Sequence, residues 1–268
     1  MDDLKTRGLV LLGCGKMGSA MLKGWLKGGL PATSVTVLDP HPSDWLKSTG
    51  VHLNVDLPAS PAIVLLAVKP QMMGDALPSL QALGNSDTVF LSVAAGITIA
   101  TYEDMLGAKT PIIRAMPNTP AAVGRGITGI VGNAATTAAQ VDLADQLLQA
   151  VGQVVRLDDE AQIRALTAVS GCGPAYVFHL IEAMAAAGEA AGLPAEMALQ
   201  LAKATVGGAG ALAEDADESP TQLRINVTSP NGVTAEALRV LMNKDDGFPP
   251  LLDRAIKAAM KRDEELAG

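Results

Sequence analysis

Seven short apolar runs, separated by segments with helical spacing, limit what residues 1–160 can fold into. The runs occupy residues 8–12, 34–39, 62–68, 88–93, 111–116, 126–131 and 153–157. Each run is continuous and rich in β-branched residues, which is typical of strands buried on both faces. Helices between such strands imply a parallel, doubly wound α/β sheet. We therefore predict one α/β domain over residues 1–160.

The character of the sequence changes after residue 160. From Gln162 onward the chain contains Ala-rich segments with helical spacing and no convincing strand pattern. So small a helical domain, with so many apolar positions, cannot bury them all by itself. We therefore predict an all-α domain over residues 161–268 and a homo-oligomer whose interface lies in that domain.

Charge and composition exclude several classes of function. The net charge is −8 and only 3% of residues are aromatic, which argues against a nucleic-acid partner. The uncharged run 165–181 is broken by glycine and proline and is shorter than the roughly 20 residues of a membrane span. The charged N-terminus leads directly into the first run, so we expect no signal peptide. Cys14 and Cys172 lack metal-ligand or disulfide spacing, so we expect no metal and a cytoplasmic location.

The first apolar run is followed at once by the motif Gly13-x-Gly15-x-x-Gly18, which opens an amphipathic helical segment. In a dinucleotide-binding loop, Gly13 permits the tight turn and Gly15 lets the pyrophosphate approach the backbone. Gly18 lets the helix pack on the strand. The phosphates then bind the free N–H groups at the helix N-terminus. This context predicts a Rossmann-type fold that binds a dinucleotide.

Asp39 ends the second run, at the position where a carboxylate binds the adenine ribose hydroxyls. A carboxylate there favours NADH, because it repels the 2′-phosphate of NADPH. Alternatively, Asp39 caps a turn ahead of Pro40, and His41 and Lys47 lie close enough to support a 2′-phosphate. Either NADPH or NADH is therefore the expected cofactor.

Three further segments end at the same predicted edge of the sheet. Lys69 and Pro70 follow the third run, where open α/β sheets bind ligands; Lys69 either contacts the cofactor or is simply solvated. The segment 92–97, "SVAAGI", ends in small residues against which a flat ring can lie. Asn118, between two prolines, either offers its amide to the nicotinamide carboxamide or closes an Asx-turn.

A polar stretch, "NVTSPNGVTAEAL" at residues 226–238, leads into an apolar helical stripe. The pattern predicts a helix that begins between residues 231 and 234, with a second anion site at its N-terminus. In this site the anion would bind the N–H groups of Gly232, Val233 and Thr234. The hydroxyls of Ser229 and Thr234 would lie beside these N–H groups. In the alternative interpretation, Ser229 or Thr234 is an ordinary N-cap.

The three histidines, His41, His52 and His179, form no arrangement typical of acid–base catalysis. His179 lies in an apolar helical segment, and we expect it to be a core residue. A hydride transfer in this chain would therefore manage its proton with a hydroxyl, a lysine or a substrate that arrives protonated.

Five segments appear in the order and spacing of a known family. They are "AVKPQ" (67–71), "SVAAGI" (92–97), "RAMPNTP" (114–120), "VSGCGPAY" (169–176) and "VTSPNGVTAEAL" (227–238). On these segments the chain resembles the pyrroline-5-carboxylate reductase family over nearly its whole length. It departs mildly from the family pattern: Asn231 and Val233 replace a usual glycine and a usual small or hydroxyl residue, and Cys172 replaces a common serine.

The resemblance implies NAD(P)H-dependent reduction of the cyclic imine 1-pyrroline-5-carboxylate to L-proline, the last step of proline biosynthesis. It also implies helical domains that interlock in a dimer, with dimers commonly assembled into decamers. By resemblance, the pyrophosphate is bound by Gly13, Cys14, Gly15, Lys16, Met17 and Gly18. The nicotinamide side is lined by Ala67, Val68, Lys69, Pro70, Ala95 and Gly96, with Asn226 nearby. The substrate carboxylate is anchored by Ser229, Asn231, Gly232, Val233 and Thr234, and the Thr234 hydroxyl contacts the ring nitrogen.

Two other functions compete with this interpretation. A 3-hydroxyacid dehydrogenase of the 6-phosphogluconate type shares the style of the glycine loop, but it requires a lysine on the first long helix of the second domain. Residues 173–192 contain no lysine. A catalytically silent NAD-binding regulator would keep the glycine loop and lack activity on the imine.

Overall fold

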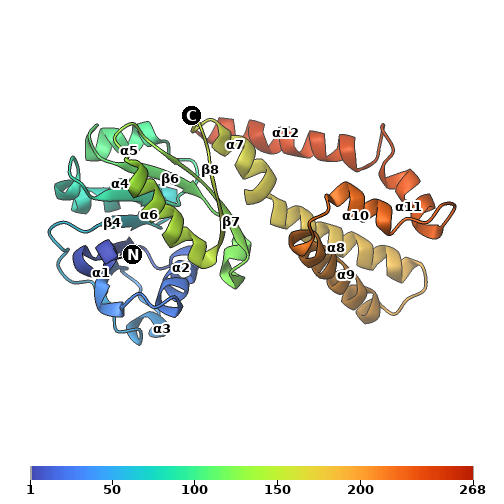
Figure 1. The fold of residues 1–268 in the computed structure, drawn as a ribbon, viewed down its shortest axis with the longest axis horizontal. Coiled ribbons are helices and arrows are strands. Elements are labelled where there is room, and N and C mark those ends of the chain that lie inside the picture. The colour runs from blue at the N-terminus through green and yellow to red at the C-terminus, as the bar shows by residue number, and fades with distance from the viewer. Residues whose placement is uncertain (1, 268) are drawn as a thin grey trace. The chain divides into compact units, whose positions relative to one another are not determined.

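The computed structural model describes residues 2–267 and divides into two compact units. The first unit comprises the chain up to Gly171 together with the part from Arg262 onward, and the second comprises Cys172–Lys261. Every strand of the described chain belongs to the first unit (Figure 1). The α/β character of the first part and the helical character of the second are therefore confirmed.

The first unit contains one eight-stranded sheet in the order β3-β2-β1-β4-β5-β6-β7-β8. The strands are β1 Leu9–Leu12, β2 Val35–Leu38, β3 His52–Leu53, β4 Ile63–Leu66, β5 Val89–Ser92, β6 Ile112–Met116, β7 Gly126–Gly132 and β8 Gly152–Arg156. Each of the seven predicted runs forms a strand. β3 was not predicted, because a strand of two residues at the edge of a sheet carries no readable pattern.

One strand pair breaks the predicted all-parallel arrangement. β6 and β7 pair antiparallel, whereas every other neighbouring pair is parallel. The connection between them contains only the short 3₁₀ helix Thr119–Val123. A parallel crossover needs about a dozen residues or more, usually with an α-helix, so this short connection returns the chain in the opposite direction.

Helices cover both faces of the sheet (Figure 1). The α-helices of this unit are α1 Asp2–Arg7, α2 Lys16–Lys27, α3 Asp44–Lys47, α4 Met73–Ala76, α5 Ile99–Leu106, α6 Ala138–Leu148 and α7 Gln162–Leu166. The 3₁₀ helices span Ala32–Ser34, Pro70–Met72, Leu77–Leu83, Thr119–Val123 and Gln149–Val151, and a π-helical turn spans Thr167–Gly171.

Alternate residues of the central strands face two separate cores. Leu9 and Leu11 of β1 pack in a cluster that also contains residues of α1, α2, α3 and α6. Val10 and Leu12 pack in a second cluster with residues of α4 and α5. Because both faces are buried, β1 and β4 are apolar at every position, which explains the continuous runs in the sequence.

The residues just after the predicted domain boundary belong structurally to the first unit. Ile163 of α7 and Ala168 of the π-helical turn are 2% and 1% exposed. Arg164 forms ion pairs with Asp263, at 3.6 Å, and with Glu264, at 3.4 Å, which bring the end of the last helix back to this unit. The compact helical unit therefore begins after Gly171, later than the boundary predicted at residue 160.

The second unit consists of helices throughout. They are α8 Gly173–Ala190, α9 Ala195–Asp215, α10 Pro220–Asn226, α11 Val233–Leu241 and the part of α12 Phe248–Ala267 that precedes Arg262. α8 and α9 approach closely, since a Cβ added to Gly188 would lie 3.3 Å from the Cβ of Ala198. None of the described helices has the length and hydropathy of a membrane-spanning segment.

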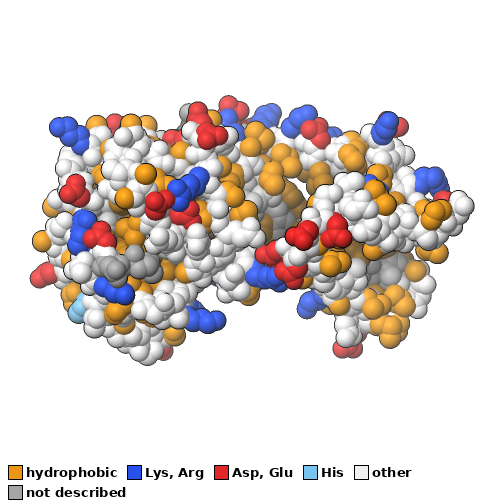
Figure 2. Space-filling model, viewed as in Figure 1, with side chains coloured by type: hydrophobic (Ala, Val, Ile, Leu, Met, Phe, Trp, Pro, Cys, Tyr) orange, Lys and Arg blue, Asp and Glu red, His pale blue; other side chains and the backbone are white. Residues whose placement is uncertain are grey.

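Many large apolar side chains of the helical unit are exposed in this single chain. Phe178, Leu201 and Leu212 are 60%, 50% and 56% exposed, and hydrophobic side chains are visible on the surface in Figure 2. The prediction that His179 is a core residue is wrong, because its side chain is 81% exposed and its Nδ1 lies 3.1 Å from Glu182. The apolar pattern of α8 therefore serves an outer surface of the chain.

Candidate functional site

The predicted cofactor residues of the first unit follow five strands at one edge of the sheet. The strand order reverses between β1 and β4, so the loops after these two strands lie side by side. Ala67, after β4, donates its N–H to the carbonyl of Leu12 at 2.8 Å. Open α/β sheets bind ligands at such a switch point, at the carboxyl ends of the strands.

The glycine loop needs its glycines for two different reasons. Gly13 has φ +87°, and a Cβ added there would lie 2.8 Å from Cγ1 of Val68. A Cβ added to Gly18 would collide with the carbonyl oxygen of Gly13, so this glycine permits the close packing of helix on strand. The roles assigned to Gly13 and Gly18 from the sequence agree with this geometry.

The N-terminus of α2 is open to a ligand. Gly15 is the N-cap and supplies no side-chain hydrogen bond, and a Cβ added to it would meet no atom within 4 Å. The first intrahelical bond runs from the N–H of Ser19 to the carbonyl of Gly15 at 2.9 Å. The N–H groups of Lys16, Met17 and Gly18 precede this bond and have no partner within the helix. The loop therefore fits a dinucleotide pyrophosphate.

Asp39 holds the glycine loop and also caps a turn. Its Oδ2 accepts a hydrogen bond from the N–H of Cys14 at 2.7 Å, and its Oδ1 accepts one from the N–H of His41 at 2.8 Å. The turn-capping alternative is therefore confirmed. A carboxylate has about four lone-pair sites, so Asp39 retains capacity for ribose hydroxyls.

Sequence reasoning missed Asn54. Its Oδ1 accepts from the N–H of Asp39 at 2.9 Å, and its Nδ2 donates to the carbonyl of Asp39 at 2.8 Å. Asn54 has φ +51°, a conformation that asparagine tolerates better than most residues. No spacing rule links it to Asp39, so only the fold shows that it positions this carboxylate.

Cys14 contributes its backbone rather than its thiol. The pKa of Cys14 is raised to about 11, mainly by burial and also by the Asp39 carboxylate, while Lys23 opposes the shift. The thiol therefore stays protonated at neutral pH. A protonated thiol is a poor nucleophile, so the N–H of Cys14 is the group through which this residue serves the loop.

The residues predicted to line the nicotinamide side lie just after the carboxyl ends of β4 and β5. Lys69 is exposed and is the N-cap of the 3₁₀ helix Pro70–Met72. Ala95 and Gly96 form an exposed turn just after β5. Gly96 has φ +76°, and a Cβ added to it would meet no atom within 4 Å. Glycine is therefore required here for backbone conformation, and the space beside it is open.

Asn118 joins two elements that are distant in the sequence. Its Oδ1 accepts from the N–H of Ile127 at 3.0 Å, and its Nδ2 donates to the carbonyl of Ser170 at 3.2 Å. The Asx-turn alternative is therefore wrong, because that turn uses a near neighbour. Asn118 instead connects the start of β7 to the π-helical turn. One of the two hydrogens on its Nδ2 has no partner in these two bonds and could be donated to a ligand.

In the helical unit, Ser229–Gly232 forms a tight turn ahead of α11. The N–H of Gly232 donates to the carbonyl of Ser229 at 3.0 Å, with proline second and Asn231 third at φ +57°. This is the pattern of a type II turn, whose third residue is usually glycine or asparagine. Asn231 therefore adopts a left-handed conformation that glycine would also adopt without strain.

The start of α11 corrects two expectations. Gly232 is the N-cap and there is no side-chain capping bond, so the interpretation of Ser229 or Thr234 as an ordinary N-cap is wrong. The N–H of Gly232 is not free, because Ser229 accepts it. The N–H groups of Val233 and Thr234 precede the first intrahelical bonds, which run from Ala235 and Glu236 to Gly232 at 3.0 and 3.3 Å.

Gly232 leaves room for the hydroxyl of Ser229. A Cβ added to Gly232 would collide with Ser229 Oγ. The helix start therefore presents two backbone N–H groups with a serine hydroxyl beside them. Asn226 lies at the end of α10, where its exposed side chain accepts from Nε2 of Gln222 at 2.7 Å.

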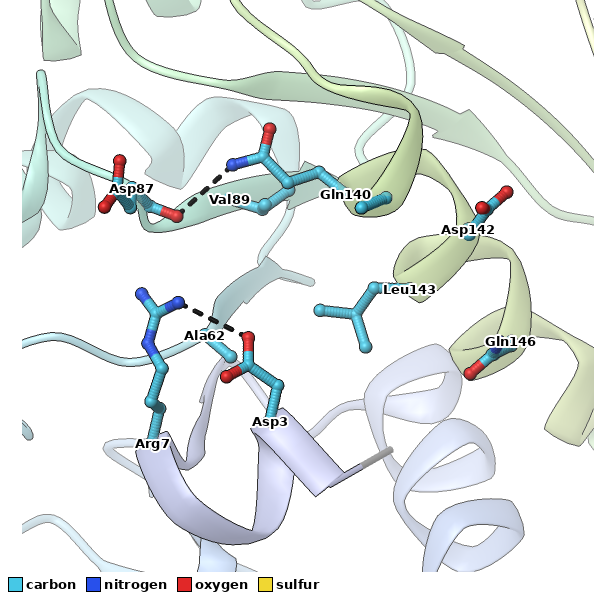
Figure 3. A pocket seen from close by; sticks show the side chains of 10 residues that line it. Asp3, Arg7, Ala62, Asp87, Val89, Gln140, Asp142, Leu143 and Gln146 are labelled. Carbon is cyan, nitrogen blue, oxygen red and sulfur yellow. Dashed lines mark hydrogen bonds and ion pairs between the residues drawn. The ribbon is translucent and has the colours of Figure 1, made fainter.

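A cavity of about 470 Å³ lies away from these residues, at the amino ends of β4 and β5 (Figure 3). On α1, Arg7 donates to Asp3 at 3.3 Å, and Nε2 of Gln140 donates to the carbonyl of Asp87 at 3.4 Å. Cofactors in open α/β sheets bind at the opposite edge. The position of this cavity therefore argues against a role in cofactor binding.

Comparison with known families gives two matches along the chain. Residues 160–266 match the family described as pyrroline-5-carboxylate reductase dimerisation. Residues 8–96 match the family described as NADP oxidoreductase, coenzyme F420-dependent. The first match begins at the predicted boundary, and the second covers the glycine loop, Asp39 and the residues after β4 and β5.

Individual relatives agree with these matches. The pyrroline-5-carboxylate reductase of Pseudomonas aeruginosa is 40% identical over 98% of both chains, and that of Pisum sativum is 36% identical over 100% of this chain and 98% of the relative. The solved pyrroline-5-carboxylate reductase of Coxiella burnetii is 35% identical, with a TM-score of 0.92 over 98% of this chain and 99% of that one. The pyrroline carboxylate reductase of Plasmodium falciparum, solved with NADP bound, is 27% identical, with a TM-score of 0.82 over the same shares. The chain belongs to the pyrroline-5-carboxylate reductase family.

Proposed function

We propose that this protein reduces the cyclic imine 1-pyrroline-5-carboxylate to L-proline, with NADPH or NADH as the cofactor. The observation that carries the proposal is that one helix in each unit, α2 and α11, begins at an uncapped glycine. By contrast, α3, α5, α6 and α10 begin with capping hydroxyl side chains, and α4, α7, α8 and α9, which also lack a capping side chain, have N-cap residues other than glycine. Two open helix N-termini suit two anionic groups, the pyrophosphate of the cofactor and the carboxylate of the substrate.

The first unit binds and orients the cofactor, which supplies the hydride when bound. The N–H groups of Lys16, Met17 and Gly18 hold the pyrophosphate, and Asp39 contacts the adenine ribose. The residues that line the nicotinamide side are Ala67, Val68, Lys69, Pro70, Ala95 and Gly96, with Asn118 and Asn226 as further contacts. Backbone atoms make up much of this set, which suits a flat ring lying against the chain.

The start of α11 anchors the substrate carboxylate. The N–H groups of Val233 and Thr234 and the hydroxyl of Ser229 donate to it, and Asn231 shapes the turn that presents them. Gly232 contributes space rather than an N–H group, because its own N–H is used within the turn. Fixing the carboxylate fixes the ring, and much of the rate enhancement is expected from this positioning.

Thr234 is the proposed catalytic residue. Hydride addition changes the charge on the ring nitrogen, and the Thr234 hydroxyl lies on the first turn of the helix that binds the carboxylate. A threonine hydroxyl is too weak an acid to act as an ordinary general acid near neutral pH. We therefore assign it the role of orienting the imine nitrogen by a hydrogen bond, with the proton carried by the substrate or delivered through water.

The protein is a homo-oligomer that associates through its helical unit. Val177, Phe178, Leu201 and Leu212 are each more than 40% exposed in the single chain, which is unfavourable unless a second copy covers them. The name of the matching family, which includes dimerisation, supports the same conclusion. We further propose that the dimers assemble into a decamer and that the protein is located in the cytoplasm.

Replacement of Thr234 tests the mechanism. Thr234→Ala should lower kcat by about 10-fold or more, since a hydrogen bond to a charged group contributes about 1.5–3 kcal/mol. The Kd of NAD(P)H should stay nearly constant. Thr234→Ser is the matched control and should keep most of the activity, because it retains the hydroxyl. Wild-type kcat in Thr234→Ala would leave Thr234 with a structural role only.

A further inference from the structure

The turn at Ala95 and Gly96 is supported from behind by buried polar side chains that the proposed mechanism leaves unassigned. Ser92, the last residue of β5, is 0% exposed. Its Oγ lies 2.6 Å from Oη of Tyr102 and accepts a hydrogen bond from the N–H of Ala94 at 3.2 Å. The Ser92 hydroxyl therefore links the hydroxyl of Tyr102 to the first part of the turn.

The other end of the same loop is held by an ion pair. Oε1 of Glu160 accepts from the N–H of Ile99, the first residue of α5, at 2.9 Å. The same oxygen accepts from Nη1 of Arg114 at 2.7 Å, and the Arg114 side chain is only 11% exposed. Residues 93–98 therefore run between two fixed ends, with the turn itself exposed.

Packing of the apolar core does not require the hydroxyl group of Tyr102. Tyr102 is 0% exposed and its ring lies in the apolar cluster between the sheet and α5. A phenylalanine would fill the same space without the cost of burying a hydroxyl. Burial raises the pKa of Tyr102 above its ordinary value, and this outweighs the opposing effects of the Ser92 hydrogen bond and Arg114. The hydroxyl is therefore neutral at biochemical pH and available as a fixed hydrogen-bond partner.

We propose that Tyr102 is a positioning residue for the reduction. By holding the Ser92 hydroxyl in one rotamer, it fixes the N–H of Ala94 and thereby the turn of Ala95 and Gly96 against which the nicotinamide ring lies. The inference rests on the proposed function for the place of the ring. Hydride transfer depends steeply on the distance and angle between donor and acceptor, so a loosened turn slows the chemical step.

Tyr102→Phe tests the proposal with cofactor binding as the main measurement. The Kd of NAD(P)H is compared with that of the matching fragment that lacks the nicotinamide ring, ADP-ribose or its 2′-phosphate. We expect NAD(P)H to bind about three- to tenfold more weakly, which is the effect of one lost buried hydrogen bond. The fragment should bind with unchanged affinity, because the glycine loop and Asp39 are untouched. In turnover, kcat should fall while the KM for the imine stays constant.

Two further variants separate positioning from general destabilisation. Ser92→Ala should reproduce the pattern of Tyr102→Phe, and the double variant should add little, because both remove the same link. Thr88→Val is the matched control. Thr88 is 0% exposed and lies at the opposite end of β5, where its hydroxyl donates to the carbonyl of Pro61. The variant therefore also loses one buried hydrogen bond, but far from the turn. This control should bind both ligands like the wild type.

Equal weakening of NAD(P)H and the fragment in Tyr102→Phe would overturn the proposal, since it would indicate a structural role alone. Unchanged binding of both ligands, with unchanged kcat, would overturn it as well. The binding measurements contain no imine. They therefore decide the role of Tyr102 even if the protein were to fail to reduce pyrroline-5-carboxylate.

Discussion

Gly232→Ala is the substitution whose effect follows most directly from the geometry of the proposed substrate site. Gly232 has φ −86°, which any residue adopts, so alanine adds no backbone strain. The added methyl group would instead collide with Ser229 Oγ, while the Ser229 carbonyl oxygen at 3.1 Å is nearer to a tolerable contact. We expect the Ser229 side chain to rotate away and the turn and α11 to remain.

The magnitude follows from the bond that is lost. A hydrogen bond from a hydroxyl to a carboxylate contributes about 1.5–3 kcal/mol, so the KM for pyrroline-5-carboxylate should rise about 10- to 100-fold. The Kd of NAD(P)H should not change, because neither Gly232 nor Ser229 is among the proposed cofactor contacts. Steady-state kinetics with varied imine, together with a cofactor titration, measure the two quantities separately.

Two comparisons make this result interpretable. Ser229→Ala should raise the same KM by a similar factor, because both substitutions remove one hydroxyl from the helix start. Gly74→Ala is the control, since a Cβ there would meet no atom within 4 Å. A wild-type KM in Gly232→Ala, or an equal loss of cofactor affinity, would refute the assignment of this turn to the substrate carboxylate.

Three other predictions concern the rest of the chain. Because the pKa of Cys14 is raised to about 11, only about one Cys14 thiol in a thousand is ionised at pH 8. The rate of Cys14 alkylation, followed by mass spectrometry of its peptide, should therefore still increase with pH above pH 10. An alkylation rate that reaches a plateau by pH 9 would contradict the raised pKa. Asp39→Asn should raise the ratio of kcat/KM for NADPH to that for NADH, since it removes the charge that repels a 2′-phosphate; an unchanged ratio would show that Asp39 does not select the cofactor. Leu201→Asp should shift the mass measured by light scattering toward the 27.4 kDa chain, whereas a wild-type protein that is already a stable monomer would contradict the proposed interface.

Much of the first unit could be predicted because its strands are buried on both faces and therefore leave continuous apolar runs. The exceptions have physical causes. β3 is too short to carry a pattern, and the direction of β7 depends on the length of the turn around Thr119–Val123 rather than on the strand itself. The exposed His179 was misjudged because an apolar helical face in one chain does not reveal whether it covers that chain's own core or a partner.

The candidate site divides in the same way. The glycine loop and the start of α11 follow from local backbone rules, so residues such as Gly13 and Val233 could be placed from sequence. The bond from Gly232 to Ser229 depends on a turn type that Asn231 permits but does not require. The partners of Asn118, and the support that Asn54 and Tyr102 give, depend on residues that only the fold brings together.

The central claim is that this chain reduces a cyclic imine with a nicotinamide cofactor. The most direct measurement follows the absorbance of NADPH and of NADH after addition of 1-pyrroline-5-carboxylate, with the proline formed quantified in the same samples. We expect one proline for each cofactor oxidised, with no oxidation when the imine is omitted. Tight cofactor binding without imine-dependent oxidation would contradict it and would indicate a nucleotide-binding regulator instead.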